Sequence, residues 1–475
     1  MNLIMPGNPR YQPKQLIPYF GYDNLYKTVA EVELATLQVL GEIGVIPPEE
    51  MEELTPEIIE AVLNIPTTEV DKVEREITHH DIRAWVRIAQ EIIGERLARW
   101  VHIPLTSYDP LDTGRMLQFH RAYCFALKPS IQELMSIFAK LVRQFADQIQ
   151  IGRTHGQHAL PITVGFWLAT TLYRVIYNAS QVELYSKGLC GKIGGAVGAH
   201  NAQIGLGFAK LCGDRSFEQR VLEKLDLKAA PISTQILPPE PLGYFLFSLC
   251  MLSASLAQFG QDCRNLMRSE IAEVIEFYAA GAVGSSTMAQ KRNPINFENL
   301  VGMWIRTKNE FGKVLDTLIS EHQRDLVGSS VARDFPIILI NVMHQLNTLL
   351  RKDENAISFL EKIRIDEEAC QRNFDASADL VLAEPLYIAL QMAGYIEDAH
   401  ELVNRKLVPL ATEEKISLLD ALEKLAEQDE TLGEVVQRIP DDIWQLLHYP
   451  EEYTGDAQEK ALEIALLAEQ KVKEM

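Results

Sequence analysis

Five long stretches of the chain repeat apolar residues with the period of an α-helix, and this pattern limits the fold more than any other feature. They cover roughly residues 116–150, 164–188, 241–278, 297–321 and 334–365. Each is far longer than the mean globular helix of about 11 residues, and no alternating apolar and polar runs of the kind that form a sheet accompany them. Since long amphipathic helices bury their apolar faces most simply against one another, we predict an all-α fold with a central bundle of long helices.

Shorter segments flank the long ones. Residues before 116 include short helical patterns broken by Pro48, Pro56 and Pro66, and residues after 365 show shorter helices with acidic loops between them. A chain of 475 residues has the length of two or three domains. We therefore predict an N-terminal helical domain (1–115), the central bundle (116–365) and a C-terminal helical domain (366–475).

Composition excludes several kinds of partner. The formal net charge of −21 at pH 7 would repel a nucleic-acid polymer. No apolar run reaches the ~18 residues of a membrane span, and the nearest, from Tyr244 to Leu256, carries serines and reads as a buried helix. The first residues lack the pattern of a secretory signal, and the six cysteines include no Cys-x-x-Cys pair. We expect a cytoplasmic protein that binds neither membranes nor nucleic-acid polymers.

The run from Gly281 to Glu298 lies between two of the long helical stretches and fits neither. It reads Gly-Ala-Val-Gly-Ser-Ser-Thr-Met-Ala-Gln-Lys-Arg-Asn-Pro-Ile-Asn-Phe-Glu. Glycines, hydroxyls and two cations in one loop suit the binding of an anion. Pro294 fits the first turn of the next helix, whose dipole favours negative charge at that end. A solvated loop without chemistry is the alternative interpretation.

Two histidine-containing segments are further candidates. His79-His80-Asp81 is a weak metal site, because adjacent residues on a helix point about 100° apart, and surface histidines are the alternative. His155 lies in a polar, glycine-containing loop, where a histidine suits a general acid or has no special role. The glycine-rich segment 191–198 lacks the order of a phosphate loop, which argues against a bound nucleotide cofactor. Because the histidine segments form no convincing metal site either, we predict no metal and no cofactor.

Two other short segments suit an anion. Thr106-Ser107 precedes a predicted helix, and hydroxyls with backbone N–H groups at a helix N-terminus can seat a carboxylate or phosphate. A simple helix cap is the alternative. Arg10-Tyr11 near the N-terminus is a surface pair unless a site forms around it.

Together these segments resemble the fumarase/aspartase superfamily. Residues 284–298 fit its signature Gly-Ser-Ser-x-Met-x-x-Lys-x-Asn-Pro-x-x-x-Glu, and nearly the whole chain resembles the adenylosuccinate lyase family within it. The segments that carry the resemblance are Arg10-Tyr11, His79-His80-Asp81, Leu105 to Asp109, Arg153 to Ala159, Ser233-Thr234-Gln235, residues 281–298, and Gln323-Arg324-Asp325 with Ser329 and Arg333.

The resemblance implies a three-domain fumarase/aspartase-type fold and a homotetramer in which three subunits build each active site. It implies elimination of fumarate from succinyl-AMP and from the succinylated aminoimidazole carboxamide ribotide, without a metal or organic cofactor. The implied catalytic residues are Ser285 as the base, His155 as the acid, and His80, Lys291 and Glu298. The implied substrate-binding residues are Arg10, Tyr11, His79, Asp81, Thr106, Ser107, Gln235, Asn293, Arg324, Ser329 and Arg333.

Departures from the family pattern keep two alternatives open. Ala289 stands in place of a proline, Gln290 of a histidine or tyrosine, Ala332 of a glutamate, and His79 of an arginine or lysine. These changes fit a paralogous lyase or cycloisomerase that acts on a non-nucleotide succinyl- or muconate-type substrate. A non-catalytic helical bundle with the same fold is the other alternative.

Overall fold

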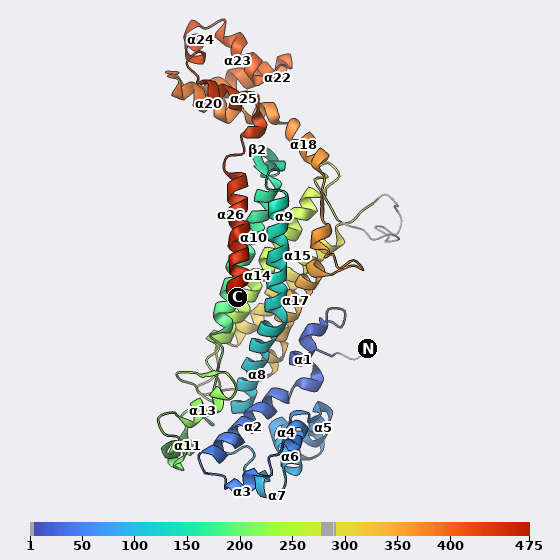
Figure 1. The fold of residues 1–475 in the computed structure, drawn as a ribbon, viewed down its shortest axis with the longest axis vertical. Coiled ribbons are helices and arrows are strands. Elements are labelled where there is room, and N and C mark those ends of the chain that lie inside the picture. The colour runs from blue at the N-terminus through green and yellow to red at the C-terminus, as the bar shows by residue number, and fades with distance from the viewer. Residues whose placement is uncertain (1–3, 277–287, 289–290) are drawn as a thin grey trace.

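The computed structural model describes residues 4–276, Met288 and residues 291–475. Long helices lie side by side along the long axis of the molecule and form its centre (Figure 1). These bundle helices are α8 (Tyr108–Ala122), α9 (Lys128–Gln144), α10 (Val164–Ser186), α14 (Glu240–Leu266), α15 (Ile295–Asp316), α17 (Pro336–Leu350) and α26 (Ala457–Glu474). The predicted all-α class with a central bundle is confirmed, although short two-stranded pairings accompany the helices.

Helix α14 is the core of the bundle and packs against α10, α15 and α17. It is long and apolar enough to cross a membrane by length and composition, but 72% of its most apolar window is buried among the other helices. Its buried hydroxyls are paired: Ser253 Oγ donates to Gln345 Oε1 at 2.7 Å, and Asn178 Nδ2 donates to Ser255 Oγ at 2.8 Å. Paired polar groups cost little to bury, so this helix fits a core position.

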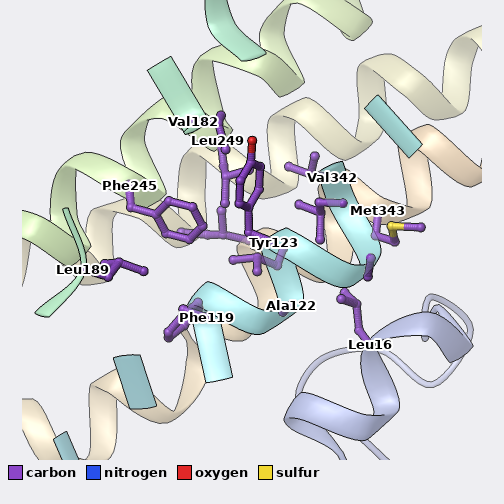
Figure 2. Close-up of a cluster of buried hydrophobic side chains, with 14 of the residues drawn as sticks. Leu16, Phe119, Ala122, Tyr123, Val182, Leu189, Phe245, Leu249, Val342 and Met343 are labelled. Atoms are coloured by element: carbon purple, nitrogen blue, oxygen red, sulfur yellow. The ribbon is translucent and has the colours of Figure 1, made fainter. Parts of the chain in front are cut away.

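Aromatic side chains fill the contact between α14 and the α8–α9 run (Figure 2). The rings of Phe119 and Tyr123 lie 6.4 and 6.1 Å from the ring of Phe245, in edge-to-face arrangements. Leu16, from the N-terminal segment, reaches the same cluster. Burying one such side chain contributes about 1.5–3 kcal/mol, so this cluster fixes α8 and α14 relative to each other.

Shorter helices cover one end of the bundle. Helix α4 begins where the sequence predicts a start, because Thr55 Oγ1 accepts from Ile58 N at 3.4 Å and Pro56 occupies the first turn. Helix α2 packs against α8, and α6 packs against α4 and α5. The helices at this end include α2 (Lys27–Glu42), α4 (Pro56–Leu63), α5 (Thr67–Val73), α6 (Asp81–Ile93), α11 (Asn201–Gly205) and α13 (Phe217–Glu223) (Figure 1).

The opposite end carries an antiparallel hairpin of β1 (Ile149–Thr154) and β2 (Gln157–Thr163), against which α18 (Glu367–Asp375) packs. Beyond it, a separate hydrophobic cluster joins a group of short helices. They include α20 (Ala383–Met392), α22 (Val408–Glu414), α23 (Leu418–Ala426), α24 (Glu430–Val436) and α25 (Asp441–His448). Helix α26 then returns along the bundle and packs against α9 and α10, so the segment 366–475 has an outer part and a part inside the bundle.

Candidate active site

The bundle separates the predicted site residues into groups at its two ends. α8, a π-helical turn (Tyr123–Leu127) and α9 form an unbroken helical run over residues 108–144. At 1.5 Å per residue, such a run is roughly 55 Å long. The segments with Thr106, Ser107, Gln235, Arg324 and Ser329 lie at the end where α8 begins, whereas those with His155, Lys291, Asn293 and Glu298 lie at the hairpin end (Figure 1). One protomer therefore does not bring the two groups together.

At the first end, Thr106 and Ser107 form the turn that leads into α8. Ser107 is the N-cap residue of the helix, but its side chain makes no capping hydrogen bond. Among the described residues, neither its hydroxyl nor the backbone N–H groups of Ser107 and Tyr108 have an acceptor within the protein. This turn offers donors at a helix N-terminus, as carboxylate binding requires. Ser107 thus occupies the N-cap position without acting as a side-chain cap.

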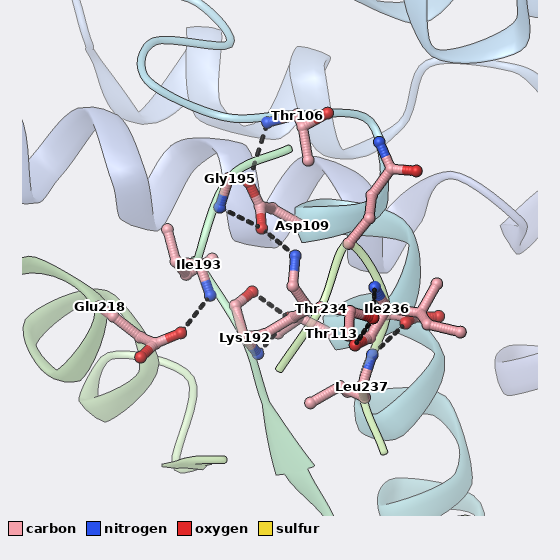
Figure 3. A network of polar contacts seen from close by, with 12 residues as sticks. Thr106, Asp109, Thr113, Lys192, Ile193, Gly195, Glu218, Thr234, Ile236 and Leu237 are labelled. Atoms are coloured by element: carbon pink, nitrogen blue, oxygen red, sulfur yellow. Dashed lines mark hydrogen bonds and ion pairs between the residues drawn. The ribbon is translucent and has the colours of Figure 1, made fainter. Parts of the chain in front are cut away.

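A buried carboxylate holds this turn in place (Figure 3). Asp109 Oδ2 accepts from Thr106 N at 2.8 Å, while Oδ1 accepts from Gly195 N at 3.2 Å and pairs with Lys192 Nζ. Both members of the ion pair are fully buried. Lys192 is fixed in turn by Thr113, whose Oγ1 accepts from Lys192 N at 3.0 Å and donates to its carbonyl at 2.8 Å. Neither Asp109 nor Lys192 was among the site residues predicted from the sequence.

The glycine-rich segment 191–198 permits close backbone approach rather than phosphate binding. Gly198 has a φ of +73°, and a Cβ there would collide with the carbonyl of Ser233. Ser233 lies two residues before Gln235, so the glycine segment packs against the backbone that carries this predicted site residue. Glu218 Oε1 accepts from Ile193 N at 2.7 Å, and its other oxygen lies 3.1 Å from His200 Nε2 (Figure 3 shows the first contact).

Gln235, Arg324 and Ser329, predicted from distant segments, come into direct contact. Arg324 Nη1 donates to Gln235 Oε1 at 3.0 Å, and Nη2 donates to Ser329 Oγ at 3.1 Å. Tyr108, which the sequence analysis missed, joins them: its Oη lies 2.5 Å from Ser329 Oγ. The four side chains come from the start of α8, the segment before α14 and the segment after α15. Three of them (Tyr108, Arg324 and Ser329) line a common cleft.

Arg10 and Tyr11 are placed elsewhere along the bundle. The Tyr11 ring packs edge-on against His344 of α17, 4.9 Å between centroids, and the Arg306 guanidinium of α15 lies 5.2 Å from it. Burial lowers the pKa of His344, and the neighbouring Arg306 and Arg351 act in the same direction. Within the described residues, no hydrogen bond joins this group to Ser329. Arg333 follows Ser329 in a 3-10 turn (Ala332–Asp334).

His79, His80 and Asp81 begin α6, near the first end. His79 has a left-handed backbone with a φ of 51°, and His80 occupies the N-cap position. His80 Nδ1 lies 3.5 Å from Arg83 N and 3.3 Å from Asp81 Oδ1, while half of its side chain is exposed. Within the described ranges, no group of three or more His, Cys, Asp or Glu side chains is placed to hold a metal ion.

At the second end, His155 stands in the tip of the β1–β2 hairpin. His155 and Gly156 are the two central turn residues, with φ of 54° and 77°, as in a type I′ turn. The hairpin is anchored by the fully buried Glu273, which pairs with Arg153 Nη2 at 2.6 Å and accepts from Gln150 Nε2 at 2.7 Å. The anchor is rigid and the tip is exposed, so His155 is presented outward.

Residues 277–287, 289 and 290, including the predicted base Ser285, lie outside the described residues. Lys291 and Glu298 are exposed, and Glu298 stands in the first turn of α15, where the helix dipole favours its charge. In the described part of one protomer, no hydrogen bond or ion pair links Glu298 to His155. The roles of these residues stay predictions.

Known proteins resemble the chain along almost its full length. The protein family described as "Lyase" matches residues 24–307. A protein named adenylosuccinate lyase from Pyrococcus abyssi is 32% identical over 466 residues, which cover 96% of each chain. Its namesake from Bacillus subtilis is 31% identical over 421 residues, or 88% of this chain and 92% of that one.

This chain belongs to the adenylosuccinate lyase family. The predicted resemblance is confirmed, and with it the assignment to an enzyme family of lyases. Solved structures of other proteins share the fold: the 3-carboxy-cis,cis-muconate lactonizing enzyme from Pseudomonas putida matches with a TM-score of 0.78 and 23% identity over 97% of this chain and 98% of that one. A fumarate lyase from Mesorhizobium sp. BNC1 matches with a TM-score of 0.77 and 22% identity, over 96% and 98% of the two chains. The fumarase/aspartase-type fold predicted for this family member is thereby confirmed.

Proposed function

We propose that the protein eliminates fumarate from succinyl-AMP, and from the succinylated aminoimidazole carboxamide ribotide, in the cytoplasm. Relatives that cover nearly the whole chain bear the name adenylosuccinate lyase. The observation that carries the proposal is the contact of Arg324 with Gln235 and Ser329 at a cleft that Arg324 and Ser329 line, beside the Thr106–Ser107 turn with its free donors. A guanidinium, hydroxyls and free N–H groups are the donors that a substrate with carboxylates and a phosphate needs.

The reaction requires two proton transfers. A C–H group beside a carboxylate is a poor acid, so the base must be supported by groups that stabilise the extra negative charge of the intermediate. We assign the base to Ser285 and the stabilising charge to Lys291. The leaving nitrogen must gain a proton, which we assign to His155. His80, Asn293 and Glu298 would orient the substrate and the acid.

We also propose that the protein works as a homotetramer with active sites shared between subunits. The described residues assigned to the site form two groups at opposite ends of a bundle whose α8–α9 run is roughly 55 Å long, so a complete site requires more than one copy. Large apolar side chains on the outer faces of three bundle helices support such contacts. They are Tyr173, Tyr177 and Leu184 of α10, Tyr244, Phe247 and Met251 of α14, and Ile305 and Leu315 of α15.

The decisive test is an ultraviolet assay of succinyl-AMP cleavage by the wild type, Ser285→Ala and Ser286→Ala. We expect rapid turnover that Ser285→Ala abolishes and that the neighbouring substitution largely preserves. No turnover by a folded, oligomeric wild type would refute the reaction. Faster turnover of a carboxymuconate would instead favour the cycloisomerase alternative, which the substitutions at Ala289, Gln290 and Ala332 motivate.

Shared sites have a separate test. His155→Ala and Arg324→Ala, which change one residue from each end of the bundle, should each have little activity, but unfolding and refolding the two proteins together should restore activity, because some sites would receive both native residues. In a random equal mixture, about a quarter of the sites would be intact, since a symmetric oligomer repeats one interface. Failure of the mixture to regain activity, while each refolded variant has the native oligomeric mass, would argue for sites within one subunit.

A further inference from the structure

Tyr108, the first residue of α8, is the most buried member of the cluster at the cleft. Its side chain is only 7% exposed, whereas Gln235, Arg324 and Ser329 are partly exposed. The Arg324 Cζ lies 3.3 Å from the centroid of the Tyr108 ring, so the guanidinium rests on the face of the ring. Stacking of this kind combines a cation–π attraction with close packing of two planar groups.

The contacts of Arg324 leave part of its hydrogen-bonding capacity unused. A guanidinium has five N–H donors, and the residues that the structure describes engage two of them, through Gln235 Oε1 and Ser329 Oγ. With the ring on one face and two acceptors at its edge, the guanidinium cannot rotate. Its remaining donors are therefore held in a fixed direction.

Arg324 also has no carboxylate partner among the described residues, although two acidic side chains lie nearby. Asp112 is committed to Arg115 Nη1 at 3.2 Å and to Leu237 N at 2.9 Å. Asp325 accepts from Glu321 N at 3.0 Å and Val327 N at 2.7 Å instead. Asp112 is near enough to Arg324 to interact with it electrostatically but makes no direct ion pair with it. A partly buried cation without a direct ion pair at a cleft is suited to a ligand that brings negative charge.

Ser329 is fixed by the same tyrosine. Its Oγ accepts from Arg324 and shares a hydrogen bond with Tyr108 Oη. Tyr108 thus sets two groups at once, one through its ring and the other through its hydroxyl. It also directly follows Ser107, so the helix start that presents the Thr106–Ser107 donors is the start from which the tyrosine projects.

We propose that Tyr108 is a positioning residue that aligns Arg324 and Ser329 toward an anionic group of the substrate, away from the bond that breaks. This inference rests on the proposed function. A residue that aligns groups for binding, and not the base or the acid, should affect KM far more than kcat. It should equally affect the affinity for AMP, the product that keeps the phosphate.

Two substitutions separate the two actions of the tyrosine. Tyr108→Phe keeps the ring under Arg324 and removes the hydroxyl, so we expect KM for succinyl-AMP to rise about threefold, the size of one modest hydrogen bond. Tyr108→Leu removes the ring as well, and we expect KM to rise about tenfold or more, with kcat within about twofold of the wild type. Tyr108→Phe should add little to Ser329→Ala, because the serine substitution has already removed the hydrogen bond to the tyrosine, together with the acceptor of Arg324 Nη2.

A matched control comes from the bundle core. Tyr123 is also buried, and its Oη donates to Glu183 Oε2 at 2.5 Å, far from the cleft. Tyr123→Phe removes a tyrosine hydroxyl of the same kind and should leave KM unchanged. Titration calorimetry with AMP gives an independent readout, in which Tyr108→Leu should weaken binding by the same factor as it raises KM.

The outcomes distinguish this inference from the proposed function. Wild-type turnover with unchanged KM and AMP affinity in Tyr108→Leu would overturn the inference and leave the function standing. A fall in kcat at constant KM would also overturn it, because the residue would then act on the reacting atoms. Absence of both turnover and AMP binding in the wild type would remove the function and the inference with it. If Tyr108→Leu does not fold, Tyr108→Phe alone and combined with Ser329→Ala decides the question.

Discussion

The substitution Lys192→Met tests how the Thr106–Ser107 turn is held. Lys192 and Asp109 are both completely buried, so removal of the ammonium leaves a carboxylate in the interior without its counter-charge. Breaking a buried ion pair in this way costs about 3–5 kcal/mol. Asp109 keeps two backbone donors, Thr106 N at 2.8 Å and Gly195 N at 3.2 Å. We therefore expect a loss near the lower limit, about 3 kcal/mol in the free energy of unfolding.

The double variant Asp109→Asn/Lys192→Met provides the second arm. It removes both charges while the asparagine carbonyl can still accept a backbone hydrogen bond, so it should be more stable than Lys192→Met alone. The matched control is Lys460→Met, because Lys460 pairs at 2.8 Å with Glu463 on the surface, with both side chains more than half exposed. Exposed pairs of this kind contribute at most about 1 kcal/mol.

Urea unfolding at one fixed protein concentration measures all three variants against the wild type. The same samples should show a raised KM for Lys192→Met, because the turn that Asp109 holds presents the donors for the substrate. A loss for Lys192→Met below about 1 kcal/mol, or equal to that of Lys460→Met, would refute the argument, since the pair would then behave as a surface bridge. A double variant less stable than Lys192→Met would refute it too, because the penalty would not come from an unpaired charge.

Three smaller predictions concern titration and thiols. The hydrogen bond to Glu218 raises the pKa of His200. The stabilisation of the fold by the protonated imidazole should therefore be complete below about pH 6.5 and lost as the pH rises through the raised pKa. Between pH 6 and 8, the urea midpoint of His200→Gln should fall less than that of the wild type. Burial lowers the pKa of His158, so stability should decline as the pH falls below about 6.5, and thermal melts of His158→Gln between pH 7 and 5 should show a weaker decline. Of the six free thiols, Cys124 and Cys190 are partly exposed and should react first with a thiol reagent, whereas the other four should react only on unfolding, as mass spectrometry of the labelled protein would show.

The helical period predicted the bundle because long amphipathic helices give a strong repeating signal, but it did not predict where the helices end. Helix α14 stops at Leu266, and Val274–Ile275 pair with Arg364–Ile365 as short strands instead of continuing the helix. Helix α17 stops at Leu350, and the Asp353 side chain then accepts from Asn355 N and Ile357 N in a turn. The local sequence, with its β-branched and aspartate residues, is compatible with a helix and with a strand or turn in these segments. Contacts with distant parts of the chain determine which of them forms.

The β1–β2 hairpin was predicted only as a loop, and its sequence explains why. The alternation of Ile149 and Ile151 with polar residues is short, and Pro161 argues against a strand. The two-residue turn uses His155-Gly156 in place of the usual Asn-Gly, although histidine tolerates a positive φ better than most residues. The His155-Gly156 pair, in which both residues can adopt a positive φ, is the local signal from which the hairpin could have been predicted.

For the candidate site, the family pattern identified Gln235, Arg324 and Ser329, and the structure joins them. The family pattern assigned no role to Tyr108 or to the Asp109–Lys192 pair. Tyr108 is 221 residues from Ser329 and Asp109 is 83 residues from Lys192, and nothing in the local sequence marks these contacts. The two sets have different physical roles. Gln235, Arg324 and Ser329 are partly exposed residues that the resemblance assigned to the substrate, while Tyr108, Asp109 and Lys192 are buried groups that hold the site in position. A pattern of exposed site residues therefore predicts which ligand is bound, and only the packed structure shows what fixes those residues in position.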